Sequence, residues 1–144
     1  MLKKVVVESK LKSNMAIEVQ ARDHKFIIDQ PKAGGGDDLG PTPLEYFFSA
    51  LAGCIGSIAL IVAKQRRIEL RACNVRVEGE LDVDVLMGKC CDVRSGFQWM
   101  KAYVEIDADL TDQEKEAFLH EVDARCPISD NIQDTTKVEF ELVK

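Results

Sequence analysis

One stretch of this sequence constrains its fold more than any other: residues 46–63 contain no charged side chain. Eighteen residues is close to the lower limit for a helix that crosses a membrane. Glycine, serine and alanine dilute the apolar character of the stretch, charged amphipathic segments lie on both sides of it, and no second such stretch occurs. We therefore expect the buried helix of a water-soluble protein rather than a membrane span.

A capping sequence marks the start of this helix. Thr42 is a favourable N-cap, Pro43 suits the first helical position, and Glu45 follows three residues after Thr42. This spacing predicts a capping box, in which Thr42 and Glu45 satisfy each other's backbone amides. We expect the helix to run to about Arg67, where a group of basic residues suits the negative end of the helix dipole better than it suits an anion site.

Alternating apolar and polar residues predict strands on both sides of the helix. These strands are residues 3–9, 15–21 and 24–29 before it, and 73–81, 97–108 and 138–142 after it. A second helix is predicted from a capping box between Thr111 and Glu114 to the residue before Pro127. This order predicts one α+β domain over residues 1–144, with mainly antiparallel sheets around the long central helix.

Two connecting segments invite a ligand interpretation. Residues 30–42 are rich in glycine, but they lack the lysine of a phosphate-binding loop and carry two aspartates, so we expect a flexible connector. Residues 83–96 contain Cys90 and Cys91. A disulfide between adjacent residues is strained, and no further Cys or His follows at zinc-finger spacing, so we expect free thiols and no metal.

The uncharged helix also predicts a partner. A helix that is apolar on every side must be covered on every side, and a chain of 16.1 kDa has few elements left to cover it. Small residues recur at helical spacing, at Ala50, at Gly53 or Cys54, and at Ser57. They allow another backbone to approach closely, so we predict a homodimer in which a second copy of the same helix provides the cover.

Charge and cysteine content narrow the class of protein further. The net charge of −6 repels polyphosphate, so we expect no nucleic-acid partner. Five cysteines are too few, and odd in number, for a disulfide scaffold. Residues 1–12 lack the apolar core of a signal peptide. We therefore expect a protein of the reducing cytoplasm, with no membrane partner.

Two cysteines are candidates for chemistry. Cys54 lies eleven residues inside the long helix, beyond the reach of the dipole at its start. Burial alone would disfavour its thiolate, so a reactive Cys54 needs a nearby cation. Cys126 shares an apolar helix face with Leu119 and Val122. From these positions alone, two small buried hydrophobic residues and two reactive thiols both remain possible interpretations.

Several motifs together resemble the OsmC/Ohr superfamily, that is, osmotically inducible protein C and organic hydroperoxide resistance protein. They are Gly-Pro-Thr-Pro-Leu-Glu at 40–45, Ala-Leu-Ala-Gly-Cys at 50–54, Cys-Pro at 126–127 and Arg-Asp at 22–23. The resemblance covers nearly the whole chain and is greatest to the generic OsmC-like branch. It implies an OsmC-like fold and an intertwined homodimer whose sites are built from both chains.

The resemblance also implies an activity: a thiol peroxidase that reduces organic hydroperoxides with neither metal nor cofactor. Cys54 would be the peroxidatic thiol, Cys126 the resolving thiol and Arg22 the partner of the thiolate, and a cellular dithiol would reduce the disulfide. Glu45 would anchor the arginine. In the peroxidase branches, however, the glutamate directly follows the motif proline, where this chain has Leu44. One helical residue is a rotation of about 100°, so Glu45 as a cap and Glu45 as an anchor both stay open.

The alternative function is a non-catalytic dimer of the same fold. It would bind small apolar molecules, and its cysteines would have another role. The two functions differ in whether Cys54 is a thiolate stabilised by a cation.

Overall fold

The structure is a computed structural model that describes residues 1–89 and 92–143. The predicted free thiols of Cys90 and Cys91 lie outside the described residues. The chain forms two compact units, Met1–Phe47 and Phe48–Lys144, and the division falls inside the long helix. Each unit is described by itself below.

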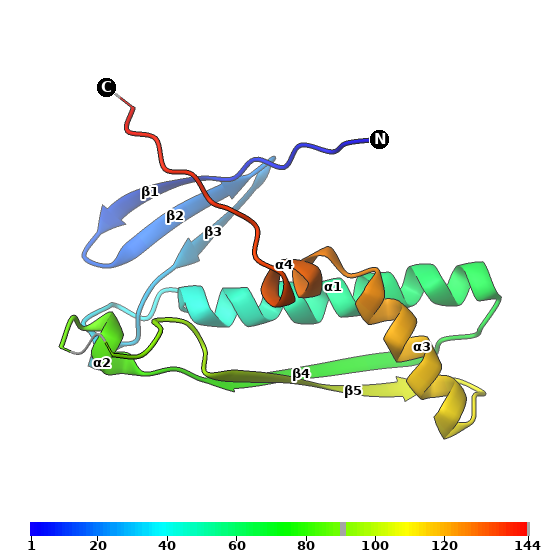
Figure 1. The fold of residues 1–144 in the computed structure, drawn as a ribbon. Coiled ribbons are helices and arrows are strands. Elements are labelled where there is room, and N and C mark those ends of the chain that lie inside the picture. Colours follow the sequence, from blue (N-terminus) through cyan, green and yellow to red (C-terminus); the bar gives the residue numbers. More distant parts are fainter. Residues whose placement is uncertain (90–91, 144) are drawn as a thin grey trace. The chain divides into compact units, whose positions relative to one another are not determined.

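The first unit contains a three-stranded antiparallel sheet (Figure 1). Its strands are β1 (Glu8–Ser13), β2 (Ala16–Ala21) and β3 (His24–Ile28), in the order β1-β2-β3. In the central strand, Val19 lies opposite Ser9 on one side and Phe26 on the other. The apolar alternation predicted the strands of this sheet, and Val19 is buried while its neighbour Gln20 is exposed. At the start of β2, however, Ala16 is buried and Met15, expected on the buried face, is exposed.

The loop after β3 is organised rather than the flexible connector that we expected. It contains a single 3-10 turn, η1 (Lys32–Gly34). The buried carboxylate of Asp29 accepts hydrogen bonds from the amides of Gln30, Asp37 and Leu39 at 2.8, 3.2 and 3.1 Å. These amides, that of Leu39 above all, lower the pKa of Asp29. The loop is therefore held by a buried charge that the glycine count does not reveal.

The long helix α1 (Pro43–Arg66) begins as predicted. The Thr42 amide donates to Glu45 Oε2 at 2.7 Å, and the Glu45 amide donates to Thr42 Oγ1 at 3.3 Å. The capping box is therefore confirmed, and the hydrogen bond from the Thr42 amide lowers the pKa of Glu45. The helix ends before Arg67, whose φ of 57° is left-handed, close to the predicted end.

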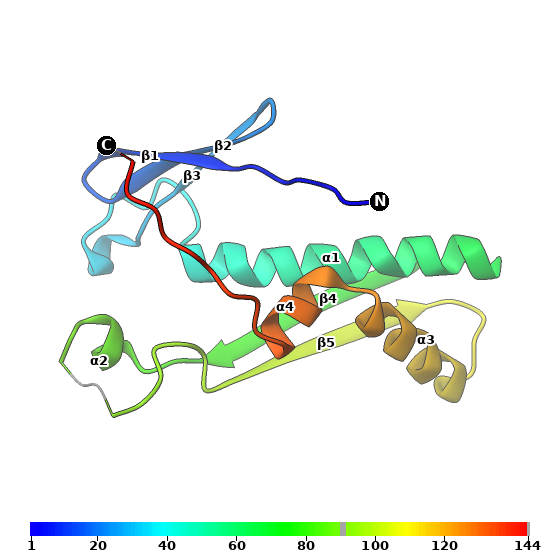
Figure 2. The same ribbon diagram turned by 45° about the horizontal axis from the view of Figure 1, so that its top comes forward.

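In the second unit, α1 lies along a pair of long antiparallel strands (Figures 1 and 2). These are β4 (Ala72–Glu80) and β5 (Trp99–Asp107), which pair along their whole length with Val75 opposite Val104. The segment between them, predicted to be irregular, includes one helical turn, α2 (Val83–Leu86), capped by the side chain of Asp82. Both long strands confirm the alternation seen in the sequence.

Two further helices complete the core of this unit. They are α3 (Asp112–Ala124), with the predicted capping box between Thr111 and Glu114, and α4 (Pro127–Gln133). The buried cluster joins α1 to α3 and to the start of α4: Leu51, Ile55, Ala59, Val62, Ala63, Phe118, Val122 and Cys126.

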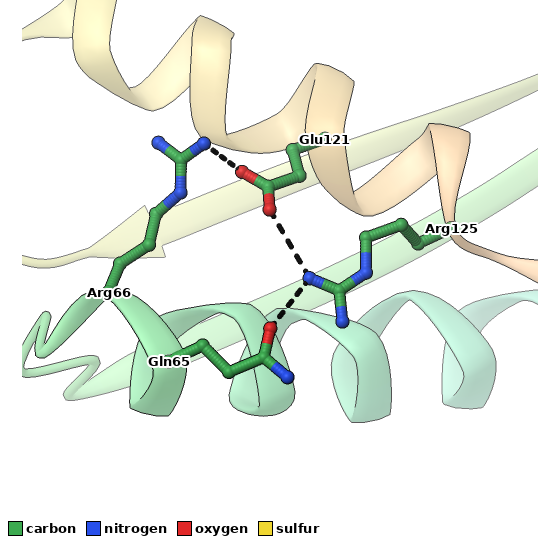
Figure 3. A network of polar contacts seen from close by, with 4 residues as sticks. All are labelled: Gln65, Arg66, Glu121 and Arg125. Carbon is green, nitrogen blue, oxygen red and sulfur yellow. Dashed lines mark hydrogen bonds and ion pairs between the residues drawn. The ribbon is translucent and has the colours of Figure 1, made fainter.

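A polar network fastens α3 to the last turn of α1 (Figure 3). Glu121 on α3 forms an ion pair with Arg66. Arg125 donates to Glu121 Oε1 at 3.2 Å and to Gln65 Oε1 at 2.9 Å. The network fixes the end of α3, the point from which the chain enters Cys126.

Three predictions about the elements require correction. The first strand begins at Glu8 rather than at residue 3. The predicted strand at 138–142 is absent, and its apolar residues Val138, Phe140 and Leu142 are exposed, because no strand within residues 1–89 and 92–143 pairs with this segment. The sequence after Pro127 was not predicted to be helical, yet it forms α4.

The helix α1 has the length and composition of a membrane-crossing helix, and 28% of its most apolar 18-residue window is buried. It is one such helix among the described residues, and the core helix of a soluble protein meets the same criteria. Its exposed side includes the small residues Ala50, Gly53 and Ser57. A Cβ added at Gly53 would meet no atom within 4 Å, so this face leaves room for another chain.

Candidate functional site

The structure brings Cys54 and Cys126 together. Cys54 lies in the middle of α1, and Cys126 forms the corner between α3 and α4. Cys54 packs against the buried cluster that contains Cys126, the Cys126 thiol lies close enough to raise the pKa of Cys54, and both thiols are free. Cys126 is fully buried, whereas Cys54 is partly exposed. Two residues that are 72 positions apart in the sequence therefore form one dithiol site.

The first turn of α4 surrounds this pair with backbone amides. Cys126 is the N-cap of α4, and its sulfur accepts a hydrogen bond from the Ser129 amide at 3.4 Å. The Ile128 amide interacts with the sulfur of Cys54. Amides in the first turn of a helix have no partner within the helix, so they are available to the two sulfur atoms.

The electrostatic environment of Cys54 opposes ionisation. Burial raises the pKa of the Cys54 thiol, the neighbouring Cys126 thiol raises it further, and the Ile128 amide lowers it in part. No cation of residues 48–89 or 92–143 contributes to this shift. Burial also raises the pKa of Cys73 on β4. A reactive Cys54 therefore needs positive charge from outside the groups that now act on it.

The other two predicted site residues lie in the first unit. Arg22 is exposed in the tight turn between β2 and β3, with a left-handed φ of 56°. Glu45 stands in the first turn of α1 and closes the capping box with Thr42. The cap role of Glu45 is confirmed. The pairing of Arg22 with Cys54, and that of Glu45 with Arg22, stay predictions.

Two cavities lie beside the dithiol site, and Ile55, the residue after Cys54, lines both. One, of about 310 Å³, lies between α1, β5 and α4, with walls that include Leu51, Met100 and Ile132. The other, of about 270 Å³, lies between α1, β5 and α3, with walls that include Val104 and Leu119. The apolar walls suit a small organic molecule. Within residues 1–89 and 92–143, no cluster of three or more His, Cys, Asp or Glu side chains could hold a metal ion.

Sequence reasoning missed three residues around the sulfur atoms, namely Ile128, Ser129 and Asp123. The buried hydroxyl of Ser129 donates to Asp123 Oδ1 at 2.5 Å and accepts from Gln133 Nε2 at 2.8 Å. A proline directly after a capping residue is typical of the first helical position, so the Cys-Pro pair was a signal for the start of α4.

Comparison with known proteins agrees with this architecture. The family model described as OsmC-like protein matches residues 34–141. Among solved structures, the OsmC-like protein of Mycoplasma pneumoniae has a TM-score of 0.82 at 22% identity, over 94% of this chain and 91% of that one. The Legionella pneumophila organic hydroperoxide resistance protein OsmC has a TM-score of 0.69 at 21% identity, over 93% and 92% of the two chains.

A third structure has the same architecture. OhrB, the organic hydroperoxide resistance protein of Bacillus subtilis, has a TM-score of 0.61 at 20% identity, over 94% of each chain. At these identities the likeness concerns the fold, which confirms the predicted α+β class. No curated protein matches the chain in sequence.

Proposed function

Because the chain belongs to the OsmC-like protein family, we propose that it is a cysteine-based peroxidase that reduces organic hydroperoxides. The observation that carries this proposal is the proximity of the thiols of Cys54 and Cys126. The apolar cavities beside Ile55 support an organic rather than an inorganic substrate. The names of the Legionella and Bacillus proteins, both organic hydroperoxide resistance proteins, support a role in peroxide defence.

The first step is the attack of the Cys54 thiolate on a peroxide oxygen. An S–O bond forms, the O–O bond breaks, and the alkoxide that leaves takes up a proton to become an alcohol. The sulfur gives two electrons to the peroxide and becomes a sulfenic acid.

The second step uses the neighbouring thiol. The Cys126 thiolate attacks the sulfur of the Cys54 sulfenic acid, an S–S bond forms, and the S–O bond breaks as hydroxide leaves and is protonated to water. A cellular dithiol then returns both cysteines to thiols by exchange. The proximity of the two thiols supports a direct second step.

We assign the activation of Cys54 to Arg22, from the same chain or from a second copy. The raised pKa of Cys54 supports the need for a cation. A guanidinium stays protonated at every physiological pH, so it can stabilise a thiolate in a partly buried site. Glu45 acts chiefly as the cap of α1, in line with its two hydrogen bonds to Thr42.

We further propose that the protein is a homodimer of the reducing cytoplasm, with no nucleic-acid or membrane partner. The exposed small-residue face of α1, at Ala50, Gly53 and Ser57, supports a second copy as its cover. The free thiols of Cys54, Cys73 and Cys126 are compatible with a reducing compartment.

The proposal is tested by peptide mapping of reduced protein after treatment with one equivalent of cumene hydroperoxide. We expect a disulfide between Cys54 and Cys126, and none that involves Cys73. The Cys126→Ser variant should instead accumulate a sulfenic acid on Cys54 that dimedone traps, and the Cys54→Ser variant should consume no peroxide. If Cys54 stays reduced while another thiol is oxidised, the assigned roles are wrong.

The second candidate is a non-catalytic dimer that binds small apolar molecules. The two cavities, of about 270 and 310 Å³, favour it. Two results together would support this function instead. A hydrophobic fluorescent probe would bind equally well to the wild type and to Cys54→Ser, and cumene hydroperoxide would not oxidise Cys54.

A further inference from the structure

A partly buried side-chain bridge spans the corner that carries Cys126, with Ser129 buried and its two partners Asp123 and Gln133 exposed. Ser129 on α4 is 8% exposed, and its hydroxyl donates to Asp123 Oδ1 at 2.5 Å. The same hydroxyl accepts from Gln133 Nε2 at 2.8 Å, one turn further along α4. The bridge therefore ties the last turn of α3 to both turns of α4, across Cys126 and Pro127.

Asp123 stands in a position that helix electrostatics disfavours. It lies in the last turn of α3, where the negative end of the helix dipole repels a carboxylate and where the helix carries no basic residue. Its charge-assisted hydrogen bond to Ser129 is of the strong kind and offsets this cost. A residue that breaks a local rule in favour of one specific contact points to a role for that contact.

The bridge fixes the atoms next to the sulfur of Cys126. The Cys126 amide donates to the Asp123 carbonyl at 3.0 Å, and the Ser129 amide donates to Cys126 Sγ at 3.4 Å. The backbones of Asp123 and Ser129 thus bind Cys126 directly, and their side-chain bridge joins the two residues to each other across it. If the bridge is lost, α4 is free to turn about the Cys-Pro corner, and the Ser129 amide leaves the sulfur.

We propose that Asp123 and Ser129 are positioning residues that hold Cys126 ready to attack the oxidised sulfur of Cys54. The inference rests on the proposed function. Neither residue touches the peroxide. The bridge acts mainly on the second step, in which the S–S bond forms, the S–O bond of the sulfenic acid breaks, and the hydroxide leaves and is protonated to water.

The test separates the two steps in the full-length protein. Ser129→Ala removes the bridge, and Asp123→Ala removes its acceptor. After one equivalent of cumene hydroperoxide, both variants should form the Cys54 sulfenic acid at close to the wild-type rate, as followed by dimedone trapping, because burial outweighs the Ile128 amide in the environment of Cys54. Formation of the Cys54–Cys126 disulfide should slow about tenfold, the effect of losing one hydrogen bond to a charged group.

Two control variants distinguish positioning from general stability. Ser129→Thr keeps the hydroxyl, and its added methyl has room because Ser129 borders the cavity of about 310 Å³, so disulfide formation should recover. Arg125→Gln loosens the same corner by breaking the ion pair with Glu121, yet it leaves the Ser129–Asp123 bridge in place. It should lower the melting temperature without slowing disulfide formation.

A second oxidant makes the inference independent of the peroxidase activity. With oxidised glutathione, Cys54 forms a mixed disulfide, which the Cys126 thiolate resolves by displacing glutathione. Slower displacement in Ser129→Ala supports the bridge even if the wild type ignores peroxides, which would refute only the proposed function. Two results would overturn the inference. One is that Ser129→Ala forms the Cys54–Cys126 disulfide at the wild-type rate with both oxidants. The other is that Arg125→Gln slows this step as much as Ser129→Ala does.

Discussion

Cys54 and Cys126 lie close together, but they occupy two different kinds of backbone position. Cys54 lies in the middle of α1, where the helix uses its own backbone amides and offers none to the sulfur. Cys126 lies at the start of α4, where the Ser129 amide donates to its sulfur. Cys54 therefore lies in a helix interior, where the backbone amides are already paired, and Cys126 lies at a helix start, where they are unpaired within the helix.

The two backbone positions differ in where the groups that act on each sulfur come from. Cys126 is held by its own neighbours in sequence, in the segment from Asp123 to Ser129, whose ends are six positions apart. Cys54 receives an amide contact only from a distant segment, at Ile128, and burial raises its pKa. We infer that the position of Cys126 is determined locally, whereas the reactivity of Cys54 depends on groups brought from elsewhere.

The largest effect is expected for Ala50→Glu. This change tests whether a second chain contributes to the reactivity of Cys54. The change places a charge on the exposed small-residue face of α1, and an interface of this kind does not tolerate an unpaired buried charge. Sedimentation should show a fall in mass from about twice to about once the chain mass of 16.1 kDa. Alkylation of Cys54 should slow in the monomer.

Ala117→Glu is the control for this change, because Ala117 is an equally exposed alanine on α3. It should leave both the mass and the rate of alkylation unchanged. A wild-type protein that is a folded, soluble monomer at low micromolar concentration would contradict the predicted dimer.

The next largest effect is expected for Arg22→Met, which keeps much of the side-chain bulk and removes the charge. Without the cation, burial dominates the environment of Cys54, and its thiolate fraction at neutral pH falls. Each unit of increase in the pKa is about 1.4 kcal/mol, so alkylation at pH 7 should slow roughly tenfold or more. Peptide-level mass spectrometry with iodoacetamide measures the rate at Cys54 alone.

Lys25→Met supplies the matched control, because Lys25 is an exposed cation on the adjacent strand β3. Alkylation of Cys54 should be unaffected by it. Equal slowing in both variants would indicate a general effect of charge, and no slowing in Arg22→Met would remove Arg22 from the site.

The sequence predicted best those elements whose signal is local. The capping boxes at Thr42 and Thr111 determined two helix starts, because each depends on side chains only three residues apart. The alternation in β4 and β5 likewise predicted which side chains are half-buried, such as Val75 and Val104. The apolar pattern at 138–142 failed because alternation indicates a face that could be buried, while a strand also needs a neighbour that accepts its hydrogen bonds.

The sequence predicted the two cysteines of the site but not the residues that surround them. Cys54 and Cys126 follow from the resemblance to a family motif, and the structure places the two thiols close enough to interact, while their pairing in a reaction stays a prediction. Asp123 and Ser129 meet because the chain turns at Cys126 into a helix, whereas the sequence predicted a helix that ends before Pro127 and none after it. A missed helix thus concealed the bridge.

The smallest effect is expected for Glu45→Gln, which separates a helix cap from a group that orients Arg22. Gln still completes a capping box with Thr42, so stability at neutral pH should change little. The pKa of Glu45 is lowered by the Thr42 amide, so the ionised cap stabilises the protein at neutral pH, and this stability is lost as the pH falls below 4.5 through the lowered pKa. Thermal melts should therefore show less acid sensitivity in the variant.

Glu114→Gln is the matched control, because Glu114 closes the same box on α3 and the Thr111 amide lowers its pKa in the same way. If Glu45 only caps, the two variants should have similar small effects on stability, and both should leave the oxidation of Cys54 by cumene hydroperoxide unchanged. Glu45→Gln could instead fold normally and be as stable as Glu114→Gln, yet lose the oxidation of Cys54. That result would show that the Glu45 carboxylate orients Arg22. The reactivity of Cys54 would then depend also on the first turn of its own helix, α1. Cys54, like Cys126, would then depend in part on groups of its own segment.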